Sequence, residues 1–192
     1  MLTLYIVRHG TSQQQRLMRS RMSGIHLTAK GKKESIQAAR FLKHKKIDLI
    51  YASPLERTQE TANIIARAVH AKVITALELN EWNLSCIQGL TMAQIRKMPI
   101  WNNYWHHPTR LKDCESLHTV AQRMMKFYQK LLSTHRNKTI VAVSHAGTIA
   151  AFILALKHHS LDELHTIAPK RGWFPSTGGI VEVKNGVVKR VL

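Results

Sequence analysis

Residues 139–156, TIVAVSHAGTIAAFILAL, form the most apolar stretch of the 192-residue chain. Its length approaches that of a membrane span, but Ser144, His145 and Gly147 interrupt the apolar run in its middle. A buried strand over 138–144 followed by a buried helix over 146–158 explains the pattern better. The stretch therefore predicts a strand–helix unit of an α/β protein, with polar residues at the turn between strand and helix.

The same alternation of apolar strands and helices extends over most of the chain. Further buried strands are expected at 3–7, 48–53 and 72–76. Helices are expected at 29–46, with Ile36, Ala39 and Leu42 on its buried face, and at 54–70 and 115–135. Residues 179–192 are typical of a β-hairpin that turns at Asn185-Gly186. This order predicts a three-layer α/β/α sandwich with a mostly parallel central sheet and an antiparallel edge.

A chain of this length favours a single domain over residues 1–192. Residues 77–114 are rich in Trp, Asn and His and are expected to form a lid or insert region. Within that region, PIWNNYWHHP (99–108) allows two interpretations. In one, a ligand touches Trp101, Trp105, His106 or His107; in the other, which we favour, the tryptophans pack the lid onto the core.

The N-terminus and the cysteines indicate a cellular compartment. No basic segment precedes the first apolar run, and that run meets Arg8 too early for a signal peptide. Cys86 and Cys114 are the only cysteines, which fits a reducing cytosol and argues against a disulfide framework. We therefore expect a cytoplasmic protein without a membrane span.

The chain is strongly basic, with 29 Lys and Arg residues against 11 Asp and Glu residues and a formal net charge of +18. Such a charge attracts polyanions, including phosphorylated metabolites, nucleic acid, acidic proteins and anionic lipid. The basic residues are spread along the chain and no nucleic-acid-binding motif accompanies them. A generally basic surface is therefore favoured over a nucleic-acid partner, and the sequence assigns no oligomeric state.

Polar residues follow three of the expected strands. Arg8 and His9 come after the first strand, Arg57 after the second, and His145 after the strand over 138–144. Ligands of open α/β sheets bind at the carboxyl ends of the strands, so these four side chains should converge. Two guanidinium groups match phosphate oxygens, one neutral imidazole can attack phosphorus, and a second, protonated imidazole can stabilise the transition state. A carboxylic acid that protonates the leaving oxygen is still needed.

The ordered motifs resemble the histidine phosphatase superfamily, in its phosphoglycerate-mutase-like branch. The hallmark of that family is Arg-His-Gly after the first strand, which is Arg8-His9-Gly10 here. The similarity continues, in the family's order, through LTAKG (27–31), SPLERTQETA (53–62), LNEWNLSCIQGLT (79–91), ESLHTVAQRM (115–124) and VAVSHAGTI (141–149).

The resemblance implies a role for each matching residue. His9 would be the nucleophile that becomes phosphorylated, and Arg8, Arg57 and His145 would form the phosphate pocket. Glu81 falls where the family keeps its proton donor. Further substrate contacts are implied for three positions: Ser12, Ser23 and Gly24.

The implied function is a metal-independent, histidine acid-type phosphatase that hydrolyses small phosphomonoesters and needs no cofactor. No HExxH motif or paired Cys/His spacing indicates a metal site. A phosphoglycerate-type mutase, a regulatory phosphoprotein phosphatase and a non-enzymatic basic binding protein remain alternatives. The short interval between Glu81 and His145 favours hydrolysis, because the mutase branch has an insertion there. Departures from the family pattern at Thr11, Gln15 and SCIQG (85–89) leave the substrate open.

Overall fold

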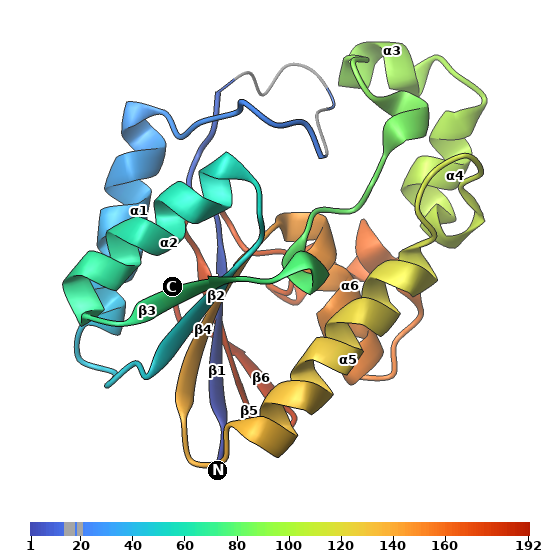
Figure 1. The fold of residues 1–192 in the computed structure, drawn as a ribbon. Coiled ribbons are helices and arrows are strands. Elements are labelled where there is room, and N and C mark those ends of the chain that lie inside the picture. The colour runs from blue at the N-terminus through green and yellow to red at the C-terminus, as the bar shows by residue number, and fades with distance from the viewer. Residues whose placement is uncertain (14–17, 19–20) are drawn as a thin grey trace.

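A computed structural model describes residues 1–13, 18 and 21–192, so Gln15 lies outside the described residues. Its centre is a six-stranded sheet in the order β3-β2-β4-β1-β5-β6 (Figure 1). The strands are β1 (Thr3–Arg8), β2 (Leu49–Ala52), β3 (Lys72–Thr75), β4 (Thr139–Ser144), β5 (Ile180–Lys184) and β6 (Val187–Arg190). Strands β1 to β4 are parallel to one another, β5 is antiparallel to β1, and β6 is antiparallel to β5.

Helices cover both faces of this sheet. Helices α1 (Ala29–Leu42) and α2 (Glu56–Val69) lie on one face, and α5 (Leu117–Thr134) and α6 (Ala146–Leu156) lie on the other (Figure 1). Alternate residues of β1 enter separate cores: Leu4 and Ile6 pack with α5 and α6, whereas Tyr5 and Val7 pack with α1 and α2. The expected three-layer α/β/α class is therefore confirmed.

The hairpin was also predicted correctly. Asn185 and Gly186 connect β5 to β6 and both have positive φ, at 51° and 71°. A two-residue hairpin turn needs positive φ at both central positions, which Asn and Gly tolerate best.

The buried face of α1 was predicted correctly for Ala39 and Leu42 but incorrectly for Ile36. Ile36 is 43% exposed, whereas Ser35 is fully buried and donates a hydrogen bond to the carbonyl of Gly31 at 2.8 Å. Ser35 also contacts the hydroxyl of Thr61 on α2. Small side chains on this face let α1 and α2 approach closely, so size rather than hydrophobicity decides which residues are buried.

Residues 77–114 contain only short elements: the 3₁₀ turns η1 (Leu77–Leu79), η2 (Ser85–Ile87) and η3 (Pro108–Arg110), and the helices α3 (Met92–Arg96) and α4 (Ile100–His106). In Figure 1, α3 and α4 lie beyond the upper end of the sheet, where β1 and β4 end. Two further short elements precede β5: η4 (Leu161–Leu164) and α7 (Ile167–Lys170). In the part of the chain that the structure describes, no helix combines the length and the apolar character that crossing a membrane requires.

The expectation that the cysteines stay unpaired is wrong, because Cys86 and Cys114 form a disulfide. The two segments that carry them lie side by side: the amide of Glu115 donates to the carbonyl of Asn83 at 2.9 Å, and the Ser85 hydroxyl donates to the carbonyl of Asp113. The sequence separation of 28 residues concealed this proximity. The bond ties the start of the 77–114 region to its end.

Replacing both cysteines with serine should lower the free energy of unfolding in non-reducing buffer. Cross-linking residues 28 apart removes chain entropy from the unfolded state, worth roughly 3–4 kcal/mol. Urea denaturation of wild type and of the double variant, each with and without dithiothreitol, measures the effect. The urea midpoints of the two proteins should differ only in the absence of dithiothreitol. A wild-type midpoint that dithiothreitol leaves unchanged would contradict the prediction.

Candidate active site

Three adjacent strands bring the expected site residues together. Arg8 at the end of β1 lies opposite Ser144 at the end of β4, and the amide of His9 donates to the carbonyl of Ser144 at 3.0 Å. On the other side of β4, the amide of Ser53 after β2 donates to the carbonyl of Val143. The strand order β2-β4-β1 therefore places all three polar strand ends at one edge, as the sequence predicts.

His9 is buried and has a defined tautomer. Its Nδ1 lies 2.7 Å from the carbonyl oxygen of Gly10, which can only accept, so Nδ1 carries the proton and Nε2 keeps a lone pair. Burial, together with the positive charge of Arg57, lowers the pKa of His9 to about 3. The imidazole is therefore neutral over the physiological pH range, as a nucleophile must be.

His145 lies against His9, with ring centroids 5.0 Å apart, and is fully buried. Its Nε2 is 2.9 Å from the hydroxyl of Ser53, and its Nδ1 is 3.7 Å from Oε2 of Glu81. Burial lowers the pKa of His145 well below its ordinary value, with further lowering by His9 and Arg57. The protein's own groups therefore keep His145 neutral, whereas the sequence-based hypothesis assigns it a proton.

Glu81 follows η1, and its side chain is 18% exposed. Its Oε1 accepts hydrogen bonds from the amide of Trp82 at 2.8 Å and from the hydroxyl of Thr148 at 3.2 Å. Burial raises the pKa of Glu81, although these hydrogen bonds and the nearby arginines oppose the shift. A raised pKa keeps a proton on this carboxyl to higher pH, as a general acid requires.

Arg8 and Arg57 supply two guanidinium groups to the same site. Arg8 donates from Nη1 to the carbonyl of Pro175 at 2.9 Å and lies 6.0 Å from the ring centroid of Phe174. Arg57, in the first turn of α2, is only 4% exposed. Burial lowers the pKa of both guanidinium groups, but Glu81 opposes this shift by favouring their charged forms. A phosphate dianion would supply the negative charge that a buried and a half-buried cation attract.

The loop after β1 is held by the start of α1. Gly31 on α1 packs so tightly that an added Cβ would lie 2.0 Å from the carbonyl oxygen of Thr11. The amide of Thr28 donates to that same oxygen, and the amide of Thr11 donates to Oε2 of Glu34 at 2.7 Å. These contacts fix the backbone that carries His9.

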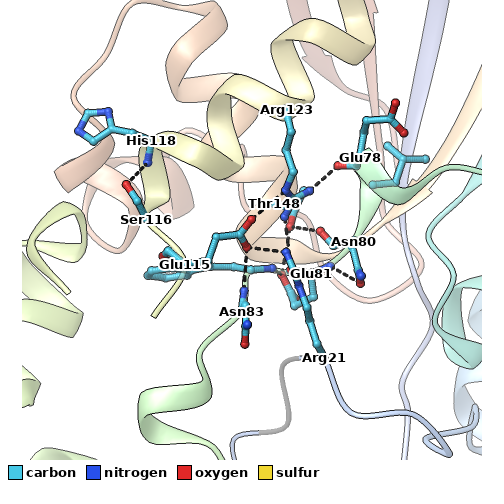
Figure 2. Close-up of polar contacts among 12 residues, drawn as sticks. Arg21, Glu78, Asn80, Glu81, Asn83, Glu115, Ser116, His118, Arg123 and Thr148 are labelled. Atoms are coloured by element: carbon cyan, nitrogen blue, oxygen red, sulfur yellow. Dashed lines mark hydrogen bonds and ion pairs between the residues drawn. The ribbon is translucent and has the colours of Figure 1, made fainter. Parts of the chain in front are cut away.

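A charged network holds the backbone around Glu81 (Figure 2). The carboxylate of Glu115 accepts from Nη2 of Arg21 at 2.6 Å and from Nε of Arg123 at 3.2 Å. Both arginines also donate to the carbonyl oxygen of Glu81, at 2.7 Å from Arg21 and 3.3 Å from Arg123. Glu115 further accepts from the amide of Asn83. Glu115 thus acts through both arginines to position Glu81.

Replacing Glu115 with glutamine should reduce kcat with little change in KM, and should lower the melting temperature. The variant loses the charge that orients both arginines, and hydrogen bonds to charged groups contribute about 1.5–3 kcal/mol each. Steady-state kinetics on a phosphomonoester and thermal denaturation check the two effects. Glu163→Gln is the matched control, because it removes a carboxylate paired with His159 outside the site. Equal kcat values for the two variants would show that Glu115 does not position Glu81.

One pocket with a volume of about 250 Å³ lies at this edge of the sheet. Its lining includes Arg8, His9, Arg57, Glu81 and Ser12. Ser23 and Gly24, for which the resemblance implies substrate contacts, are exposed and are not among its lining residues. Their contact with substrate stays a prediction.

The stretch 99–108 contributes a residue that the sequence reasoning did not single out. Tyr104 on α4 lines the pocket, whereas Trp101, Trp105, His106 and His107 are not among its lining residues. Trp101 stacks on Trp105 with centroids 5.1 Å apart, and both pack against the core. The packing interpretation thus agrees with the positions of the tryptophans. Among the described residues, no group of three or more His, Cys, Asp or Glu side chains is placed to hold a metal ion.

This geometry agrees with comparisons with known proteins. A model of the histidine phosphatase superfamily (branch 1) matches residues 4–172. The chain belongs to this superfamily. Its phosphoglycerate-mutase-like relatives include a 2,3-bisphosphoglycerate-dependent phosphoglycerate mutase of Bartonella henselae, 30% identical over 84% of each chain.

Two further proteins are similar to this chain over most of their length. Phosphoserine phosphatase 1 of Hydrogenobacter thermophilus is 31% identical over 81% of this chain and 76% of its own. The solved structure of Bacillus stearothermophilus YhfR superposes with a TM-score of 0.84 at 25% identity, covering 100% of this chain and 96% of that one. The superfamily thus includes relatives named as phosphatases and relatives named as mutases.

Proposed function

We propose that the protein hydrolyses small phosphomonoesters through a phosphohistidine intermediate. The observation that carries the proposal is the pairing, in one pocket, of a neutral His9 whose Nε2 keeps a lone pair with a Glu81 whose pKa burial raises. The low pKa of the His9 imidazole and the raised pKa of the Glu81 carboxyl widen the pH range in which the nucleophile is neutral while the proton donor is protonated.

In the first step, Nε2 of His9 attacks phosphorus and the bond from phosphorus to the leaving oxygen breaks. Glu81 transfers its proton to that oxygen, which departs as an alcohol. Arg8 and Arg57 bind the phosphoryl oxygens and stabilise the charge that develops on them. His145 is neutral in the protein alone. The negative charge of a bound phosphate group would favour a proton on His145, which could then donate a hydrogen bond to a phosphoryl oxygen.

In the second step, the Glu81 carboxylate takes a proton from water as the water oxygen attacks the phosphorus of phosphohistidine. Inorganic phosphate departs, Nε2 of His9 regains its lone pair and Glu81 is again protonated. No metal or cofactor enters either step. The finer assignment as a histidine acid-type phosphatase is part of this proposal. The disulfide between Cys86 and Cys114 removes the cysteine argument for a cytoplasmic location.

The mutase alternative is supported by the Bartonella henselae relative. Both activities share the first step and differ in whether water or a second substrate accepts the phosphoryl group. Interconversion of 2- and 3-phosphoglycerate that depends on 2,3-bisphosphoglycerate, with no release of inorganic phosphate, would establish the mutase instead.

The test is release of inorganic phosphate from p-nitrophenyl phosphate in the presence of EDTA. We expect turnover that the chelator does not reduce. Turnover that EDTA abolishes and zinc restores would overturn the metal-independent mechanism. Salt-sensitive DNA binding without turnover of any phosphate ester would favour the basic binding protein.

A further inference from the structure

The pocket lining has two chemically different parts. Arg8, His9, Arg57 and Glu81 form the polar part, and Phe174 lies beside it, 6.0 Å from Arg8. Leu84, Leu164, Tyr104 and His165 belong to the uncharged remainder, which we call the apolar end. A volume of about 250 Å³ lies just below the range of roughly 300–1,000 Å³ for drug-sized ligands, so the pocket suits one small molecule. A phosphate held near His9 would place the rest of the ester among the apolar side chains.

The apolar end carries no formal charge among the described residues that line it. The two titratable side chains there are Tyr104 and His165. Burial raises the pKa of Tyr104 to about 12 and lowers the pKa of His165 to about 4, so both are neutral between these values. A carboxylate on the leaving group would lose its hydration there without gaining a cation from the described lining residues, and Glu81 would repel it once ionised.

Tyr104 is held rigidly by its aromatic neighbours. Its ring is nearly parallel to that of Trp82, with centroids 6.3 Å apart and an interplanar angle of 10°. His165 lies 4.9 Å from Tyr104 and stacks on Trp105 at 5.0 Å. A fixed aromatic side chain loses little conformational freedom when it contacts a ligand, so this wall is preorganised for a planar or apolar group.

We propose that the pocket selects phosphomonoesters whose alcohol part is uncharged and aromatic or otherwise apolar, and that Tyr104 is the side chain that recognises it. The inference rests on the proposed function and adds its substrate class. A second, more polar cavity shares Arg8, His9 and Ser12 with this pocket and is also lined by Lys30, so it is the competing position for an acidic leaving group.

The decisive comparison is benzyl phosphate against 4-carboxybenzyl phosphate, which differ only by a carboxylate far from the reacting bond. We expect kcat/KM for benzyl phosphate to be at least tenfold higher. Equal or higher kcat/KM for the carboxylated ester overturns the inference. If wild type prefers 4-carboxybenzyl phosphate and the Lys30→Met variant does not, the carboxylate binds in the polar cavity.

A variant pair tests the role of Tyr104. Tyr104→Ala should raise KM for benzyl phosphate about tenfold and leave little discrimination between the two esters. Asn102→Ala is the control on the same helix, because Asn102 is exposed and does not line the pocket, and it should keep the wild-type discrimination. Discrimination that Tyr104→Ala retains in full would overturn the assignment of Tyr104.

Binding measurements separate this inference from the proposed function. If wild type hydrolyses neither ester, the proposed function fails, and calorimetric titration of each ester into the wild-type protein then decides the inference by itself. At least tenfold tighter binding of benzyl phosphate supports it. Equal or weaker binding of benzyl phosphate overturns it.

Discussion

Replacing His9 with alanine is expected to reduce kcat/KM for a phosphomonoester by about three orders of magnitude or more, because loss of a covalent nucleophile removes the entire two-step route. The side chain is buried between Arg57 and His145, so its removal leaves a space that water can fill but no group that can attack phosphorus. The arginines remain, so the variant should still bind phosphate esters.

The measurement is a rapid-quench experiment with a ³²P-labelled ester. Wild type should accumulate label on the protein that acid releases and alkali preserves, as expected for phosphohistidine, and His9→Ala should show none. His44→Ala is the matched control, because His44 is exposed on the surface beyond α1. Protein-bound label at the wild-type level in the His9→Ala variant would show that another residue is the nucleophile.

The architecture was predictable from the sequence because buried strands and amphipathic helices have different hydrophobic periods. The limits of individual elements were harder to predict. The helix expected over 29–46 ends at Leu42, and the helix expected from Pro54 begins at Glu56. Helix ends depend on capping hydrogen bonds and tertiary contacts, which a hydrophobic pattern does not encode.

The convergence of Arg8, His9, Arg57 and His145 was predictable from topology alone, because all four follow strands that prove to be adjacent. Glu81 needed the family resemblance, since an acidic residue in a loop has no periodic signal. The position of Tyr104 in the pocket wall could be seen only in the structure.

Four of the supporting residues lie inside motifs on which the resemblance rests, whereas Arg21 and Glu34 lie outside them. Ser53, Glu115, Arg123 and Thr148 all belong to these stretches. The motifs show that these residues match the family pattern, but only the contacts show that Glu115 and Arg123 hold the backbone of Glu81.

Replacing Glu81 with glutamine should reduce the rate by an amount that depends on the leaving group. Glutamine keeps the size of the side chain but has no proton to transfer, and general acid catalysis contributes typically 10²–10⁴-fold, or about 3–5 kcal/mol. A good leaving group such as p-nitrophenolate departs with little protonation, whereas an alkoxide does not. The loss should therefore be far larger for benzyl phosphate than for p-nitrophenyl phosphate. Equal losses for the two esters would contradict the role of proton donor.

The pH dependence of kcat/KM gives an independent test of the same role. Wild type needs neutral His9, whose pKa is about 3, and protonated Glu81, whose pKa burial raises. Activity should therefore rise as pH increases through about 3 and fall as pH increases through the raised pKa of Glu81. In Glu81→Gln, the decline attributable to Glu81 should disappear, while any decline caused by ionisation of the substrate's phosphate persists in both proteins. Since the two pKa shifts have opposite signs, burial widens the pH range in which nucleophile and acid are ready together.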